Sequence, residues 1–167
     1  MEPGMEVNSS GTQLMNAIWK DAKVAAQSCL IIQSLKHWTG RDLLPDTPQE
    51  EIGRGLFEAP FVVVSHGTET DPVLNYGNRA ALNLWEMDWE ELTKLPSRYT
   101  AEAPNREERK RLLAAVTANG FIDDYSGIRI SKTGRRFRIE QATVWSLVDE
   151  NGRLQGQAAM FDEWVQL

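Results

Sequence analysis

The fold is decided by residues 121–167, FIDDYSGIRISKTGRRFRIEQATVWSLVDENGRLQGQAAMFDEWVQL. This stretch divides into three segments, FIDDYSGIRIS, RRFRIEQATVWSLV and LQGQAAMFDEWV, which are separated by turns at residues 132–134 and 149–152. Each turn contains a pair, Thr133-Gly134 or Asn151-Gly152, that tolerates the positive φ angles of a tight hairpin. The stretch therefore predicts three successive antiparallel strands.

The middle segment alternates between two sets of side chains, which is typical of a half-buried strand. Burying the second set would bury several charges at a high cost in free energy, so we expect the first set to face the interior. Two members of the expected inner set, Gln141 and Thr143, are polar. A buried amide needs a hydrogen-bond partner, which is either a ligand or another group of the protein. The first set is Phe137, Ile139, Gln141, Thr143, Trp145 and Leu147, and the second is Arg136, Arg138, Glu140, Ala142, Val144 and Ser146.

Composition indicates one globular domain of ordinary character. Of the 167 residues, 41% are hydrophobic and 25% are charged. The net charge of −6 argues against a nucleic-acid binder that relies on electrostatics. The one cysteine, Cys29, has no partner for an internal disulfide, which favours a reducing compartment. The sequence has no apolar run of ~20 residues and no secretory signal, so we expect a cytoplasmic protein that does not contact membranes.

The first part of the chain divides into a polar tail, residues 1–11, which we expect to be disordered, and a helical segment, residues 12–58. A long helix is expected from about Thr12 to His37, with a stop at Thr39-Gly40. The helix either covers one face of the sheet or pairs with its copy in a dimer, and the sequence leaves both interpretations open. Its apolar stripe is Leu14, Ile18, Ala22, Ala25, Cys29, Ile32 and Leu35.

Residues 59–167 are expected to form an α+β domain. Two strands, Phe61–His66 and Val73–Tyr76, make a hairpin, and Asn78 and Asp88 are placed to cap the two short helices that follow. A longer helix is expected at Arg106–Ala118, before the three C-terminal strands. The order from Pro60 onward is thus two strands, short helices, one longer helix and three strands.

This order resembles that of PAS domains. The segments PVLNYGNRAALNLWEM and GFIDDYSGIRISKTGRRFRIEQATVWSLVDENGRLQGQAAMFDEW are more closely similar to the MEKHLA family, a PAS-like module found alone in bacteria and at the C-terminus of some plant transcription factors. The resemblance extends over about residues 56–165. It implies a five-stranded antiparallel sheet in the order 2-1-5-4-3, with helices on one face and a small pocket between them.

The resemblance also implies what the module does. Related modules sense a ligand or bind a partner, and they commonly dimerise through N-terminal helices and sheet faces. Residues 79–100 lack the cysteine of flavin photosensors, and the longer helix lacks a haem-ligating histidine, so we expect neither flavin nor haem. A small apolar ligand stays possible. The residues expected to line the pocket are Phe137, Ile139, Gln141, Thr143, Trp145 and Asn78.

Motifs for catalysis and metal binding are missing from the sequence. Ser65 stands beside His66, but no nucleophile motif surrounds the pair, and the two histidines, His37 and His66, have no paired ligand spacing. We expect no catalytic residue and no metal site. A basic cluster around the first C-terminal turn is either a solvated rim or, less in keeping with the negative net charge, a site for an acidic partner or nucleic acid. It comprises Arg129, Lys132, Arg135, Arg136 and Arg138.

Three hypotheses follow from the sequence. The first is a sensory or interaction module without catalysis, which acts in signalling through a homodimer and an unknown small-molecule or protein partner. The second is a small α+β enzyme that acts on a hydrophobic substrate. The third is a structural dimerisation domain with a filled core.

Overall fold

A computed structural model describes residues 17–102 and 106–167. The tail at residues 1–11 and the expected helix start at Thr12 lie outside the described residues. The helices are α2 (Ala22–Thr39), α3 (Ile52–Phe57), α4 (Arg79–Trp85), α5 (Trp89–Leu92) and α6 (Arg106–Asn119), with 3-10 helices η1 (Ile18–Lys20), η2 (Gln49–Glu51) and η3 (Ser97–Thr100). The strands are β1 (Val62–His66), β2 (Leu74–Gly77), β3 (Phe121–Ile130), β4 (Arg136–Val148), β5 (Leu154–Phe161) and β6 (Glu163–Gln166).

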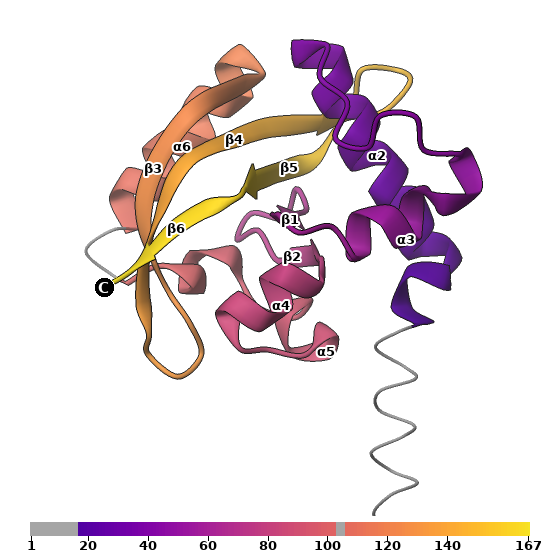
Figure 1. The fold of residues 1–167 in the computed structure, drawn as a ribbon. Helices are drawn as coiled ribbons and strands as arrows, with labels where there is room; N and C mark the ends of the chain where they lie inside the picture. The colour runs from indigo at the N-terminus through magenta and orange to yellow at the C-terminus, as the bar shows by residue number, and fades with distance from the viewer. Residues whose placement is uncertain (1–16, 103–105) are drawn as a thin grey trace, which may run out of the picture.

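The strands form one antiparallel sheet in the order β2-β1-β5-β4-β3 (Figure 1). This is the order expected from the resemblance, which is thereby confirmed. The last expected strand is divided at Asp162 into β5 and β6. Both parts pair with β4, because residues 143–148 of β4 lie opposite β5 and residues 137–140 lie opposite β6.

Gln141 interrupts the alternation of β4 with a β-bulge. Its φ angle of 48° lies in the left-handed region, which a residue with a side chain rarely adopts. The register of the β3–β4 pair shifts between Ile139 and Ala142, the interval that contains Gln141. An unpaired residue of this kind exchanges the two faces of a strand, because side chains alternate with a period of two.

The expected inward face of β4 is therefore wrong beyond the bulge. Phe137 and Ile139 lie on the face that α4 covers, where they pack with Ala142. Trp145 and Leu147 lie on the opposite face, where they pack against α2. We term the side of the sheet under α2 the outer face and the side under α4 and α6 the inner face.

Helix α2 covers the outer face of its own sheet, alongside the paired ends of β4 and β5 (Figure 1). Ile31, Ile32 and Leu35 are buried there against Trp145 and Leu147. Of the two interpretations of this helix, the structure shows the one in which it packs on the sheet.

The limits of α2 are set by its caps. The side chain of Asp21 accepts hydrogen bonds from the backbone amides of Lys23 (2.8 Å) and Val24 (3.3 Å), so a new helix begins after η1. The expected uninterrupted helix is wrong at this point. Its expected stop is confirmed, because Gly40 ends α2 with a φ of 77°.

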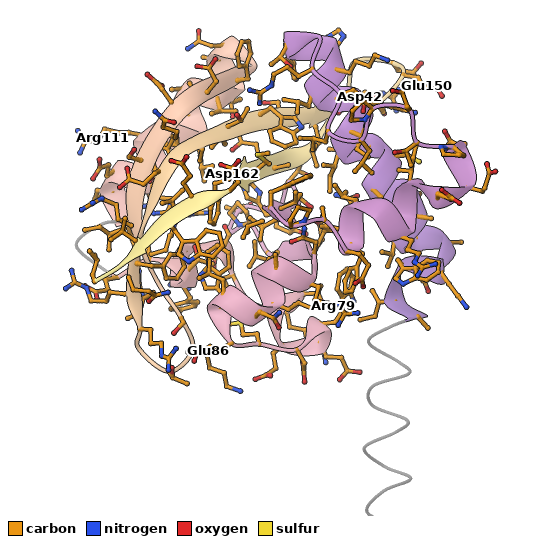
Figure 2. The ribbon with its side chains drawn as sticks, in the orientation of Figure 1. Asp42, Arg79, Glu86, Arg111, Glu150 and Asp162 are labelled. Carbon is orange, nitrogen blue, oxygen red and sulfur yellow. The ribbon has the colours of Figure 1, made fainter. Side chains whose placement is uncertain are left out.

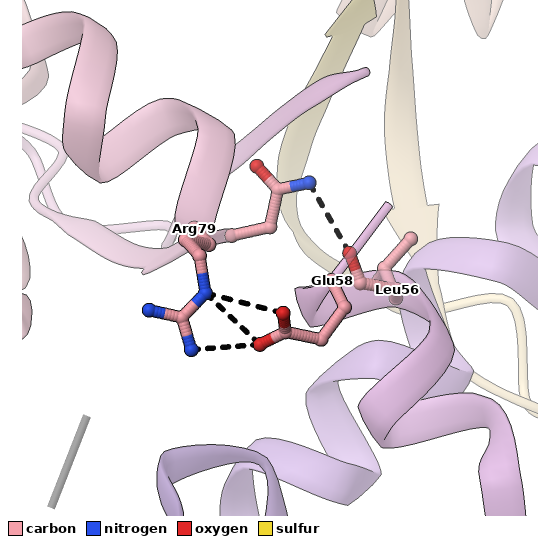
Figure 3. Close-up of polar contacts among 4 residues, drawn as sticks. Leu56, Glu58 and Arg79 are labelled. Atoms are coloured by element: carbon pink, nitrogen blue, oxygen red, sulfur yellow. Dashed lines mark hydrogen bonds and ion pairs between the residues drawn. The ribbon is translucent and has the colours of Figure 1, made fainter. Parts of the chain in front are cut away.

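Asn78, the residue that precedes α4, uses its side-chain amide to connect several backbone segments. Its Oδ1 accepts from the amides of Ala81 and Val63 (both 3.1 Å), and its Nδ2 donates to the carbonyls of Leu56 (3.1 Å) and Phe61 (2.8 Å). Figure 3 shows the bond to Leu56 together with the adjacent ion pair of Arg79 and Glu58, whose closest atoms, Nη2 and Oε1, are 2.8 Å apart. These contacts tie the end of α3 to α4.

Candidate functional site

A cavity of about 70 Å³ lies between the inner face of the sheet and the segments η3 and α6. This volume accommodates a few water molecules or a solute of a few heavy atoms, since one water needs roughly 10–15 Å³. Most of the wall is apolar, and the polar side chains are spread over several elements. The apolar members include Val64, Leu74, Leu112, Ile139, Ala142, Val144, Ala159 and Phe161, and the polar members include His66, Trp85, Ser97, Thr100, Arg109, Tyr125, Arg129 and Gln157.

The residues expected to line the pocket are divided by the bulge. Ile139 lines the cavity, and Phe137 is buried next to it against Trp85, with 5.3 Å between the ring centroids. Gln141 is exposed. The amide therefore does not line this cavity, because the positive φ angle turns it out of the inner face.

The remaining expected residues serve the architecture and do not line the cavity. On the outer face, Thr143 Oγ1 accepts a 2.7 Å hydrogen bond from Arg41 Nη2. Trp145 Nε1 donates to the carbonyl of Ile31 at 3.1 Å and so holds α2 on the sheet. The side chain of Asn78 is fully occupied by the four backbone contacts described above. None of these three residues lines this cavity.

Two buried arginines form the polar end of the cavity. Arg109 on α6 and Arg129 on β3 are each 7% exposed. Arg109 Nη2 donates to Ser97 Oγ, whereas Arg129 donates to the Ile128 carbonyl (2.9 Å) and to Tyr125 Oη (3.1 Å). Burial, together with the charge of Arg129, lowers the pKa of Arg109 to about 10. The guanidinium group of Arg109 therefore carries its charge at neutral pH.

His66 closes the cavity at the end of β1. Its Nδ1 lies 2.8 Å from the carbonyl oxygen of Gly67, so Nδ1 carries the proton and Nε2 keeps its lone pair. Burial lowers the pKa of His66; the hydrogen bond to Gly67 opposes this effect and the charge of Arg109 adds to it. The ring is neutral at pH 7, and its buried Nε2 has no hydrogen-bond partner in the described structure.

Gln157 and Trp85 each contribute a buried polar atom that has no described partner. The Nε2 of Gln157 donates to the Leu113 carbonyl (3.0 Å) and to Thr117 Oγ1 (2.8 Å), which fixes the amide and leaves Oε1 unpaired. The indole Nε1 of Trp85 is likewise unpaired, although this side chain is 3% exposed. Buried polar atoms are nearly always paired, so their concentration around one cavity points to an absent ligand or to solvent.

The basic cluster around the first C-terminal turn separates into two kinds of residue. Arg129 is buried in the cavity wall, which corrects its assignment to a solvated rim. The others form ion pairs within the chain: Lys132 with Glu91, Arg135 with Glu86 (3.7 Å), Arg136 with Glu102 (2.8 Å) and Arg138 with Glu140 (2.8 Å). Internal carboxylates therefore already partner these four basic groups.

Sequence reasoning missed Arg109, although the signal was present. Arg109 precedes Leu112, Leu113 and Val116 by three, four and seven residues, which puts it on the apolar stripe of α6. A charged residue on such a stripe is a candidate for a buried function. The sequence predicts His66 only as an isolated histidine, and its place in the cavity wall follows from the tertiary structure.

Two further classes of site were checked against the described residues. Ser65 and His66 do not act as a pair there, because Ser65 Oγ donates to Asn75 Oδ1 (2.6 Å) and accepts from Gln27 Nε2 (3.1 Å) on the α2 side. Within residues 17–102 and 106–167, no three His, Cys, Asp or Glu side chains cluster closely enough to hold a metal ion. Among the same residues, no helix is both long enough and apolar enough to cross a membrane.

The fold is that of PAS domains. The chain superposes on the PAS domain of a protein from Colwellia psychrerythraea with a TM-score of 0.58 at 13% identity, covering 71% of this chain and 95% of that one. The light-state dimer of the fungal blue-light photoreceptor Vivid aligns with a TM-score of 0.56 at 12% identity (80% and 91% covered). A PAS domain of a LuxR-family transcriptional regulator from Burkholderia thailandensis, in complex with ethanol, aligns with a TM-score of 0.51 at 18% identity (68% and 95% covered).

Within that class, the chain belongs to the MEKHLA domain family, whose sequence model matches residues 25–166. The match includes most of α2. Among curated proteins, the homeobox-leucine zipper protein ATHB-9 of Arabidopsis thaliana is 31% identical over 127 residues (72% of this chain), and HOX10 of Oryza sativa subsp. indica is 22% identical over 166 residues (98% of this chain). The chain spans 15% and 19% of the lengths of these two relatives.

Proposed function

We propose that the chain is a sensory module without catalytic activity, in which the inner cavity binds a small molecule and its occupancy alters a protein interface. The observation that carries this proposal is the cavity itself, with unpaired buried atoms at His66, Trp85 and Gln157. A purely structural domain with a filled core is not expected to keep a void lined by such polar atoms, because each needs a partner and costs about 1–3 kcal/mol without one.

The ligand is small and does not resemble flavin or haem. The cavity of about 70 Å³ is less than half of the ~150 Å³ that suffices for benzene in an engineered cavity. The similar PAS domain from Burkholderia thailandensis holds ethanol, a molecule of the size that this cavity accepts. The cavity has no carboxylate in its wall to act with His66 as an acid–base pair, which supports binding over catalysis.

The interface that responds is a homodimer contact on the outer face. Helix α2 covers the half of the outer face near Trp145, and β6 extends beyond it, where Val165 is 44% exposed. The Arg138–Glu140 ion pair lies opposite Val165 and Glu163 on this strand pair. A second copy meeting this surface in antiparallel fashion places basic and acidic groups together, and the similarity to the Vivid dimer supports the arrangement.

Native mass spectrometry of protein purified from cells, combined with light scattering, tests the proposal. We expect a retained small molecule and a monomer–dimer ratio that changes when the ligand is removed. Ala142→Leu fills the cavity, because Ala142 is 1% exposed in its wall, whereas Ala114→Leu makes the same change on the exposed side of α6. Ligand loss in the first variant alone supports the proposal. The proposal is refuted if the purified protein carries no ligand and its monomer–dimer ratio is the same with and without the Ala142→Leu change.

A further inference from the structure

The cavity wall contains two positive charges that form no ion pair with a carboxylate among the described residues, although the charge of Asp71 acts weakly on Arg109. Arg109 and Arg129 line it at 7% exposure each, and neither appears in any ion pair of the described residues. Charged groups are almost never buried unless they are paired, because removal from water is costly. The proximity of the two charges adds repulsion, which is visible in the depressed pKa of Arg109. Empty, this site is electrostatically unfavourable.

The described hydrogen bonds do not use up the donors of these arginines. A guanidinium group has five N–H donors, yet Arg109 has one described acceptor, the hydroxyl of Ser97, and Arg129 has two, which are both neutral. Trp85 adds an unpaired N–H to the same cavity wall. The polar end of the cavity is therefore rich in donors and poor in acceptors, which is the chemistry of an anion site.

The rest of the cavity limits the size and character of that anion. Val64, Leu74, Val144, Ala159 and Phe161 supply an apolar wall on which only a hydrocarbon portion packs favourably. At about 70 Å³, the space admits a chain of roughly two to four carbons. Two acceptors, Nε2 of His66 and Oε1 of Gln157, stay available for a donor group such as a hydroxyl.

We propose that the cavity binds a short-chain carboxylate, whose carboxylate group meets the guanidinium groups of Arg109 and Arg129 and whose carbon chain packs on the apolar wall. The planar guanidinium fork matches a carboxylate and forms charge-assisted hydrogen bonds with it. A hydroxyl on the chain donates to Gln157 or His66 and strengthens binding. Phosphate carries oxygen on every side and has no portion for the apolar wall, so it fits the site less well.

This inference rests on the proposed function and names the class of ligand for the same cavity. The ligands for the test are sodium propionate, lactate and phosphate, with propionamide as the uncharged analogue of propionate, all at one ionic strength set with sodium chloride. Thermal unfolding and titration calorimetry are measured at neutral pH. We expect propionate at ten times its Kd to raise the Tm by about 3–6 °C, with a larger shift for lactate at the same concentration.

Matched variants assign the effect to the cavity. Arg109→Gln and Arg129→Gln each remove one buried charge, and we expect carboxylate binding to weaken at least about tenfold in both. Arg111→Gln is the control, because Arg111 is exposed on the same helix and points away from the sheet (Figure 2). Removing an unpaired buried charge relieves repulsion, so the ligand-free Arg109→Gln protein is expected to have a Tm equal to or above that of the parent chain. That result separates lost binding from lost folding.

The outcomes separate the two proposals. If propionamide binds as well as propionate, the cavity is a site for neutral molecules: the carboxylate inference fails and the sensory function stands. If phosphate or chloride alone stabilises the protein, the site takes inorganic anions and the inference fails as well. If no small molecule binds and assembly ignores the Ala142→Leu change, the sensory function itself fails. An equal loss of binding in Arg111→Gln shows that the effect is bulk electrostatics and overturns the assignment.

Discussion

The two faces of the sheet each bury one tryptophan, and these two side chains show how differently the faces are built. On the outer face, Trp145 is completely buried, and its Nε1 donates to the carbonyl of Ile31 at 3.1 Å. On the inner face, Trp85 is 3% exposed, yet its Nε1 has no partner in the described structure. On the outer face the indole of Trp145 is thus bonded to α2, although Tyr76 Oη there has no described partner, whereas on the inner face polar atoms of His66, Trp85 and Gln157 are unpaired around a void.

This difference indicates a division of labour. Satisfied buried contacts stabilise the folded state, and unsatisfied ones are retained where a ligand completes them. Under the function proposed above, helix α2 and the outer face supply stability, and α6 with the inner face supplies recognition. The comparison is open to experiment because matched changes are available on the two faces.

The largest expected effect comes from shortening the outer tryptophan. Trp145→Ala removes a completely buried side chain and the hydrogen bond to α2, so we expect a loss of about 3–5 kcal/mol in the free energy of unfolding. Urea denaturation measures this loss. Replacement by Phe sharpens the comparison, because Trp145→Phe loses a hydrogen bond whereas Trp85→Phe has none to lose. We expect about 2 kcal/mol for the first and less than about 1 kcal/mol for the second. Equal losses would contradict the division between the faces.

A smaller effect is expected at the bulge, where the two faces change places. Gln141 is exposed with a φ of 48°, a conformation that costs a residue with a side chain about 1 kcal/mol. Gln141→Gly is therefore expected to stabilise the protein by about 0.5–1 kcal/mol in urea denaturation. Gln155→Gly is the control, because Gln155 is an exposed strand residue without a positive φ, and there glycine is expected to destabilise by a similar amount. Destabilisation by both changes argues against strain at the bulge.

The smallest effect concerns the pH dependence of the inner face. The pKa of His66 is lowered from its ordinary value of 6.5, so below that pH the unfolded chain takes up a proton that the folded chain does not. This contribution to stability is complete above about pH 6.5 and decreases as the pH falls from there toward the folded-state pKa. His66→Gln should reduce the change of the urea midpoint with pH between pH 7.5 and about pH 6. His37→Gln, on the exposed side of α2, should leave this pH dependence as it is in the parent chain. A slope that His66→Gln does not change would show that the ring is not buried in neutral form.

The pairing of successive strands was predictable because its signals are local, whereas the full order, with β1 beside β5, was implied only by the resemblance to PAS domains. The Asn151-Gly152 and Thr133-Gly134 turns define two hairpins, and the alternation around Phe137 defines a half-buried strand. The exchange of faces at Gln141 was not predictable from a period of two, since a single bulge reverses every later position. A sign of it existed in the sequence: before Gln141 only alternate residues are apolar, whereas Ala142, Val144, Trp145 and Leu147 show both parities. Such a pattern indicates a strand buried on both faces.

The cavity was less accessible to sequence reasoning than the fold. It is assembled from β1, β2, β3, β4, β5, α4, η3 and α6, and only the tertiary structure brings His66, Arg109 and Arg129 together. The apolar stripe of α6 carried a usable signal at Arg109, but nothing local distinguishes Arg129 from the exposed arginines nearby. Burial decides which basic residue belongs to a site, and burial depends on the whole fold.

Because side chains alternate along a strand, the bulge in β4 decides which of two neighbouring residues faces the cavity and which faces α2. Val144 lines the cavity, whereas the next residue, Trp145, donates a hydrogen bond from its ring N–H to a backbone carbonyl of α2. Under the proposed function, a ligand that displaces this strand slightly would move the side chains of Val144 and Trp145 together. The cavity and helix α2 are thus separated by the backbone of a single strand. A displacement caused by the proposed ligand could therefore reach α2 without a hinge, a lid or a long chain of intervening side chains.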